Sequence, residues 1–287
     1  MDYIFKLLLA LKYNLLFKKK VMIKYSVTLL LFFVSLLSFG QHKSYARIVL
    51  DTLCSSHFDG RGYFNDGEKR AANFIKKEYE NIGLKPVEGK FLQYFNLTTN
   101  SIIGDVSFNV NKTKLLPGVD YLISPTSTSY SGKSTVLYID KSTLMNLESF
   151  KKLQPSFKNK FVIIDHTLVA GESKEIKNQV SEIIQFLKYA PNLELNAVIE
   201  VIKNKLTYTA SQDKAERPHI IVLKDKLPKK LKSVTLKIEN EFNTNYQSQN
   251  VVGFIEGEIK DEFIYVVGHY DHLGRMGKNV YFPGAND

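Results

Sequence analysis

The amino-acid sequence predicts an α/β fold in which a mixed sheet with helices carries a mostly β inserted domain. Helical periodicity follows residue 45, short β-branched runs fill residues 92–245, and a run that is apolar on both faces returns at residues 263–267. The 287-residue chain is 44% hydrophobic, which is enough apolar material for a sizeable core. We therefore expect a globular α/β protein.

Two helices are expected ahead of residue 92. Apolar residues at helical spacing indicate a short helix over residues 45–53. A longer helix begins at Asn65 or Asp66, with Glu68 in position to close a capping box after Asn65, and it ends at Gly83.

Short runs of β-branched residues predict a mostly β module over about residues 92–245. Each run is bounded by Gly, Pro, Asn or Lys, as strands usually are. One helix interrupts them over residues 172–191, where apolar residues recur at helical spacing. The strands are expected at residues 104–110, 134–140, 160–165, 196–202, 219–223 and 234–239.

The last forty residues follow a different pattern. Residues 251–255 and 263–267 predict two strands, and the second suits the buried interior of an α/β sheet because it is apolar on both faces. Open α/β sheets place ligand-binding residues at the carboxyl ends of such strands. His269 and Asp271 stand there, two residues apart, so we expect their side chains to project to the same side.

His269 and Asp271 are residue types that form zinc sites. A neutral imidazole is a good zinc ligand, and a nearby carboxylate commonly holds its other nitrogen. On spacing alone, a surface loop with two histidines would look similar. The glycine-rich loop over residues 270–286 could return Asp287 to face His269, and a carboxylate can bridge two cations. This combination points to a metal centre.

Motifs at both ends of the chain resemble peptidase family M28, a family of zinc aminopeptidases and carboxypeptidases. "EFIYVVGHYDHLG" and the later "YFPGAND" resemble the family's strand ending in H-x-D-H and its G-A-x-D loop. "SSHFDGRGYFNDGEKRAANFIKKEYENIGLKP" is similar to the family's opening, a G-R-G loop that leads into a helix. The resemblance spans about residues 45–287, with a vaguer match between the two ends.

The resemblance implies a domain order. Residues 41–91 would begin a zinc-peptidase domain, a mixed sheet with helices, and residues 246–287 would supply its core strands and metal loop. Residues 92–245 are similar in position to the protease-associated domain that many members insert.

The resemblance also implies site residues. His269 matches the family's histidine ligand to one zinc, Asp271 the catalytic aspartate that orients it, and Asp287 the carboxylate that bridges two zinc ions. His166 and His219 lie in the expected insert and are not candidates for this site.

Two features depart from a working site. The family's paired glutamates, a further acidic ligand and a final histidine all follow the bridging aspartate, and this sequence ends before them. We therefore expect an N-terminal fragment that is truncated within the active-site loop and inactive alone. The segment Gly60, Arg61 and Gly62 has no metal role by resemblance, and we expect a turn with a surface arginine.

The complete protein is expected to be an exported zinc-dependent exopeptidase, an aminopeptidase, acting on peptide substrates. Two alternatives stay open: a non-catalytic secreted binding module, and a single-zinc homologue similar to glutaminyl cyclases. A Glu-Glu pair and a late histidine after Asp287 would favour the peptidase. The sequence does not decide the substrate side chain, amino- against carboxypeptidase activity, or the oligomeric state.

Residues 1–40 predict export. A basic start at Lys24, an apolar stretch over residues 27–37 and small residues before Gln41 are typical of a signal peptide. That stretch is short for a membrane span of roughly twenty residues, although residues 3–17 would also suit a hydrophobic anchor. The formal charge is +10, but the lysine clusters lack stacking aromatics, so no nucleic-acid partner is expected.

Overall fold

The computed structural model describes residues 43–285. They belong to two compact units, Met1–Leu50 and Asp51–Asp287, and the first unit contributes to them only the start of helix α2 (Lys43–Leu53). This helix was expected. The expected signal peptide and the site residue Asp287 lie outside the described residues. Within residues 43–285, no helix combines the length and the apolar character needed to cross a membrane.

Helix α3 (Gly67–Asn81) follows two short 3-10 helices, η1 (Ser56–Arg61) and η2 (Phe64–Asp66). The expected helix is confirmed, but the expected capping box is wrong. Asp66 at the N-cap has a left-handed backbone, with φ of 55°, and its side chain makes no capping hydrogen bond. Glu68 is fully buried and turns to a neighbouring strand instead.

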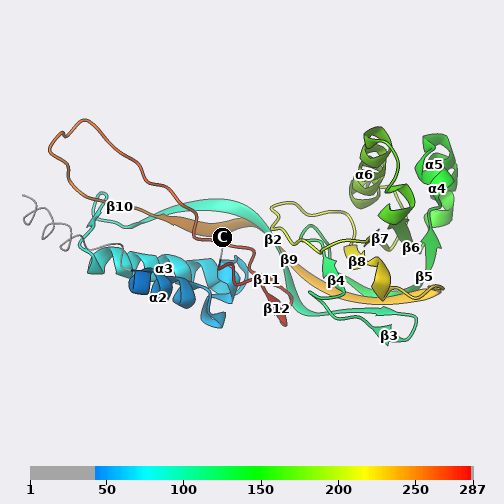
Figure 1. Cartoon of the computed structure of the whole chain (residues 1–287), viewed down its shortest axis with the longest axis horizontal. Coiled ribbons are helices and arrows are strands. Elements are labelled where there is room, and N and C mark those ends of the chain that lie inside the picture. Colours follow the sequence, from blue (N-terminus) through cyan, green and yellow to red (C-terminus); the bar gives the residue numbers. More distant parts are fainter. Residues whose placement is uncertain (1–42, 286–287) are drawn as a thin grey trace, which may run out of the picture. The chain divides into compact units, whose positions relative to one another are not determined.

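Strands β2 (Leu92–Val110) and β9 (Ser233–Val251) form the longest pair of the fold. They are antiparallel over their whole length, with two register shifts, between Leu97 and Thr99 and between Ile103 and Ser107. In Figure 1, helix α3 lies beside one end of this pair, and strands β5 to β8 lie toward the opposite end. The expected boundaries at residues 92 and 245 stay predictions.

The main sheet is mixed and has ten strands. Its order is β12, β11, β2, β9, β5, β6, β7, β8, β4, and β3 pairs with β2. Strands β5 to β8 are parallel to one another, and β1 pairs with β10 in a separate two-stranded sheet. The bounds are β1 Lys85–Pro86, β3 Thr113–Lys114, β4 Tyr121–Ile123, β5 Tyr130–Tyr138, β6 Phe161–Asp165, β7 Ala197–Ile202, β8 His219–Leu223, β10 Gly253–Phe254, β11 Arg275–Met276 and β12 Val280–Tyr281.

The predicted α/β class is confirmed by this sheet and its helices. Helix α6 (Lys174–Tyr189) matches the expected helix, and the Ser173 side chain caps it by accepting from the backbone N–H of Ile176. Helices α4 (Lys141–Leu144) and α5 (Leu147–Leu153) were not predicted. Short 3-10 helices follow at η3 (Gln154–Phe157), η4 (His166–Val169) and η5 (Lys224–Lys226).

Strand β6 divides the core into two clusters. Phe161 and Ile163 pack with β2, β4 and β9, whereas Val162 and Ile164 face a second cluster that includes residues of α6. Alternate side chains of a strand point to opposite faces, so a strand buried on both faces reads as a continuous apolar run. Figure 1 shows α4, α5 and α6 together on one side of β5, β6 and β7.

The expected buried strand over residues 263–267 is wrong in this structure. These residues have no strand assignment, and their five side chains are highly exposed, with Ile264 and Val266 each 96% exposed. A run of this kind is buried only when neighbouring strands flank it on both sides. No described strand pairs with it.

Candidate functional site

The candidate site is built around the segment His269 to His272, which follows the exposed run. His269 Nδ1 lies 3.0 Å from the backbone oxygen of Asp271 and 3.4 Å from its carboxylate Oδ1. The two side chains therefore lie close together, although the strand from which their common direction was expected is absent here. With the proton on Nδ1, the lone pair of the ring is on Nε2, which is the form that ligates a metal.

Tyr63 contacts the second carboxylate oxygen of Asp271, Oδ2. Its hydroxyl donates to Oδ2 over 3.0 Å. Burial raises the pKa of Tyr63 well above its usual value, and the negative charge of Asp271 raises it further. The phenol therefore stays protonated at physiological pH and keeps donating to Asp271.

Tyr270 anchors the same segment to the sheet. Its hydroxyl accepts from Gln249 Nε2 over 3.0 Å and donates to the backbone oxygen of Gln249. Gln249 also donates to Glu68, which accepts a second hydrogen bond of 2.8 Å from Tyr246. Burial raises the pKa of Tyr270 to about 12. A hydrogen-bonded network thus connects helix α3, strand β9 and the residue between His269 and Asp271.

Glu68 is the buried acid of this network. Burial raises the pKa of its carboxyl, and the hydrogen bonds from Tyr246 and Gln249 oppose that rise. A buried carboxylate needs such donors because an unpaired buried charge is costly. The capping-box position therefore carries a residue that supports the site.

Arg61 corrects a further expectation. It was expected on the surface of a turn, but it is 4% exposed and its backbone is left-handed, with φ of 52°. Its guanidinium donates to the backbone oxygens of Leu53, Tyr270, Pro283 and Gly284. The cause is the number of donors: five N–H groups in a plane suit a site crowded with carbonyl groups.

The backbones of the two motifs are in direct contact. Gly60 O accepts from the backbone N–H of Gly274, and Arg61 O accepts from that of His272, both over 3.0 Å. A Cβ atom built on Gly62 would lie 2.3 Å from the Cα of Gly274, so only glycine allows this approach. The G-R-G segment therefore forms a close backbone contact surface, here called the seat, for the loop that follows His269.

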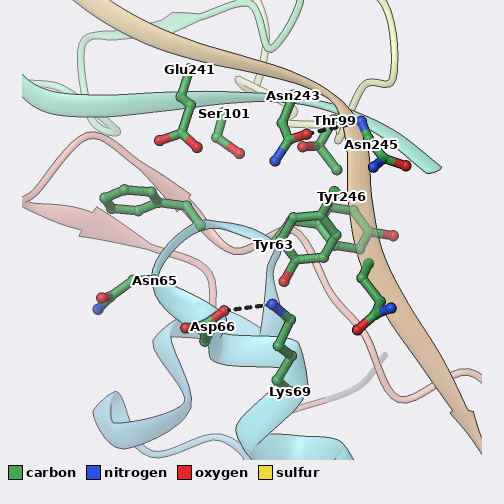
Figure 2. A pocket seen from close by; sticks show the side chains of 12 residues that line it. Tyr63, Asn65, Asp66, Lys69, Thr99, Ser101, Glu241, Asn243, Asn245 and Tyr246 are labelled. Carbon is green, nitrogen blue, oxygen red and sulfur yellow. Dashed lines mark hydrogen bonds and ion pairs between the residues drawn. The ribbon is translucent and has the colours of Figure 1, made fainter. Parts of the chain in front are cut away.

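A polar pocket of about 270 Å³ adjoins Tyr63. Figure 2 shows Tyr63, Asp66 and Lys69 facing side chains from β2 and β9. Asp66 and Lys69 form an ion pair of 2.9 Å, and Lys69 also lies over the ring of Tyr246. The remaining lining residues are Phe64, Asn65, Thr99, Ser101, Glu241, Asn243, Asn245 and Gln247.

The candidate residues fit zinc in type but are incomplete. His269 and Asp271 bring an imidazole and a carboxylate within 3.4 Å, although the hydrogen bond of Nδ1 is to the backbone oxygen of Asp271, and Asp287 is outside the described residues. Within residues 43–285, no three or more His, Cys, Asp or Glu side chains converge so as to hold a metal ion. His166 and His219 lie elsewhere, each 2.8 Å from the carboxylate of Glu200.

Comparisons with solved structures add a shared fold. The chain is 19% identical to BSAP, a zinc aminopeptidase from Bacillus subtilis, with a TM-score of 0.54 over 85% of this chain and 53% of that chain. An aminopeptidase from Aneurinibacillus sp. strain AM-1 gives 14% identity and a TM-score of 0.49 over 83% and 53%. A peptidase M28 precursor from Shewanella amazonensis SB2B is 12% identical, with a TM-score of 0.41 over 72% of this chain and 52% of that chain.

The chain spans about half the length of these solved structures. No family model matches it, and no curated protein does. The similarity to the Bacillus subtilis structure shows that the chain has this aminopeptidase-type α/β fold over most of its length.

Proposed function

We propose that this chain carries part of the metal centre of an exported zinc-dependent exopeptidase, an aminopeptidase that releases N-terminal residues from peptides. The main observation behind this proposal is that several side chains hold the His269 segment in place. Tyr63 binds Asp271, Tyr270 is held through Gln249, and Arg61 binds the loop. The fold shared with a zinc aminopeptidase agrees with this reading.

In this proposal each residue has one role. His269 would bind zinc, Asp271 would orient the imidazole of His269, and Asp287 would supply a further carboxylate ligand. Zinc in such a site supplies a Lewis acid that polarises the peptide carbonyl group. Tyr63 keeps Asp271 in place by donating a hydrogen bond to its carboxylate.

The pocket beside Tyr63 is the proposed place for the substrate. Its lining holds the carboxylates of Asp66 and Glu241 and the ammonium group of Lys69. The net charge of the pocket lining is therefore negative. That balance suits the amino end of a peptide, and the amides of Asn243 and Asn245 suit its backbone. Export rests on the signal-like residues 22–40, and the peptide is the proposed partner.

The test uses the protein purified from its own source. Zinc is measured by elemental analysis, and peptides with a free amino end are assayed with and without 1,10-phenanthroline. We expect bound zinc and amino-acid release that the chelator abolishes and zinc restores. His269→Ala should remove both, whereas His57→Ala, a change at an exposed histidine, should leave both intact.

Hydrolysis that ignores the chelator would contradict the proposal, as would a native protein without zinc. Peptide binding without turnover, in a protein that lacks zinc, would favour the non-catalytic binding module instead.

A further inference from the structure

We propose that Arg61 is the positioning residue that holds both ends of the candidate metal loop, defined as residues 269–285, in one arrangement. The part of this inference that concerns zinc affinity rests on the proposed function. The part that concerns the geometry of the loop rests only on the contacts of Arg61.

The guanidinium of Arg61 contacts the loop at its beginning and at its end. Nε donates to the backbone oxygen of Tyr270 over 2.8 Å, and Tyr270 lies between His269 and Asp271. Nη1 donates to Pro283 O over 2.8 Å and Nη2 to Gly284 O over 3.0 Å, a few residues ahead of Asp287. One planar group therefore connects the beginning of the loop to its end.

The arrangement depends on the shape of the arginine side chain. All three guanidinium nitrogens donate, and Nη1 also reaches Leu53 O over 3.0 Å. A lysine ammonium has three donors at a single point and cannot reach acceptors on several sides of a plane. Arginine to lysine is therefore not a conservative change here.

The backbone of Arg61 agrees with a positioning role. Its left-handed φ of 52° is uncommon for a residue with a side chain, and such conformations persist where the surroundings over-determine them. Here the Arg61 carbonyl accepts from the backbone N–H of His272, so the side chain and the backbone of one residue both bind the loop.

Arg217 provides an internal comparison. It is also buried, at 5% exposed, and its guanidinium donates to the backbone oxygens of Leu187, Ala190 and Leu193. Those acceptors all belong to one short segment at the end of α6. The loop acceptors of Arg61 are 209 to 223 residues away in sequence and come from two separate segments.

The experiment compares Arg61→Ala and Arg61→Lys with the matched variants Arg217→Ala and Arg217→Lys in the full chain. Hydrogen exchange by mass spectrometry follows peptides that cover residues 269–285. Zinc affinity is measured by competition with a chromophoric chelator. Both Arg→Ala variants are also measured with added guanidinium ion at low millimolar concentration, below any denaturing range.

We expect Arg61→Ala and Arg61→Lys to speed exchange in the loop, including the amides of His272, Gly274 and Phe282. Zinc affinity should fall about 10- to 100-fold, as it does when residues that orient metal ligands are lost. Guanidinium ion should slow the exchange again in Arg61→Ala. The Arg217 variants should keep the loop exchange and zinc affinity of the wild type, because distant sites are independent.

Unchanged loop exchange in Arg61→Ala would overturn the inference whatever the zinc result. Equal loosening of the loop in Arg217→Ala would also overturn it, because the effect would then be global destabilisation. If the protein purified from its own source binds no zinc, the proposed function fails, and loop exchange alone decides the role of Arg61.

Discussion

Gly62→Ala tests the contact between the two motifs with a single methyl group. Gly62 has φ of −94° and ψ of 177°, an extended backbone that alanine adopts without strain. The added Cβ would lie 2.3 Å from the Cα and 2.9 Å from the N of Gly274, both backbone atoms. The change therefore probes the close approach alone, because backbone preference contributes no penalty.

The magnitude follows from two opposing effects. Replacing glycine by alanine in a permitted conformation stabilises a protein by about 0.4–1 kcal/mol through the unfolded state. Forcing a methyl group into a filled space costs about 1–3 kcal/mol. Gly171 is the matched control, because no atom lies within 4 Å of a Cβ there and its φ is not positive. The gain through the unfolded state is common to both substitutions and cancels, so relative to Gly171→Ala we expect Gly62→Ala to be less stable by about 1–3 kcal/mol.

Thermal unfolding followed by circular dichroism measures this difference. A chain of this size loses about 2–4 °C of melting temperature per kcal/mol, so the two variants should differ by about 2–12 °C. Hydrogen exchange should locate the disturbance in the loop around Gly274. If Gly62→Ala melts at or above the temperature of Gly171→Ala, the motifs are not in contact and the described seat is wrong.

Two further predictions concern hydrogen bonds to carboxylates. Tyr63→Phe removes the hydroxyl that donates to Asp271 and should lower the free energy of unfolding, measured in urea, by about 0.5–1.5 kcal/mol. The control Tyr265→Phe, at an exposed ring, should leave that free energy unchanged. Equal effects of the two changes would count against the hydrogen bond. Burial alone would raise the pKa of Glu200, but hydrogen bonds from His166 and His219 lower it below its ordinary 4.5. The ionised Glu200 carboxylate therefore stabilises the fold above that pH, and this stabilisation is lost as the pH falls. Glu200→Gln should make the urea midpoint fall less steeply between about pH 5 and 3. A dependence of the midpoint on pH that the substitution leaves unaltered would contradict this.

The regular elements of the fold were predictable because their signals are local. Helix α6 follows from apolar spacing, and β6, β7, β8 and the first part of β9 follow from β-branched runs, although β9 continues beyond the expected residues 234–239 to Val251. Helices α4 and α5 were missed because they are short, and α4 contains a single buried side chain, Leu144. Periodicity over so few residues does not separate a helix from a loop.

The run at residues 263–267 shows where local signals stop. Its apolar side chains correctly indicate a segment suited to burial, but burial depends on which strands lie beside it. Sequence composition says nothing about the presence of those strands. The residues of the run are therefore largely exposed, from 72% at Phe263 to 96% at Ile264.

Part of the candidate site was also out of reach. His269 and Asp271 were found from their spacing, but Tyr63 and Arg61 reach the loop across 208 to 223 residues of sequence. Glu68 is connected to the loop only through Gln249 of β9, which binds Tyr270. The one available signal was the pair of glycines around Arg61. Glycines flanking a charged residue indicate a close backbone approach as readily as a surface turn.

The continuous pairing of β2 with β9 ties the folding of the site to that of the distant sheet. Leu236 and Ile238 of β9 fill the core, while Tyr246 and Gln249 further along the same strand hold Glu68. A slip of one residue turns every side chain of a strand to the other face. A shift of one residue in the register of β2 and β9 would thus expose the apolar core and break the hydrogen bonds to Glu68 at the same time. The site therefore forms only when the sheet has paired in the correct register.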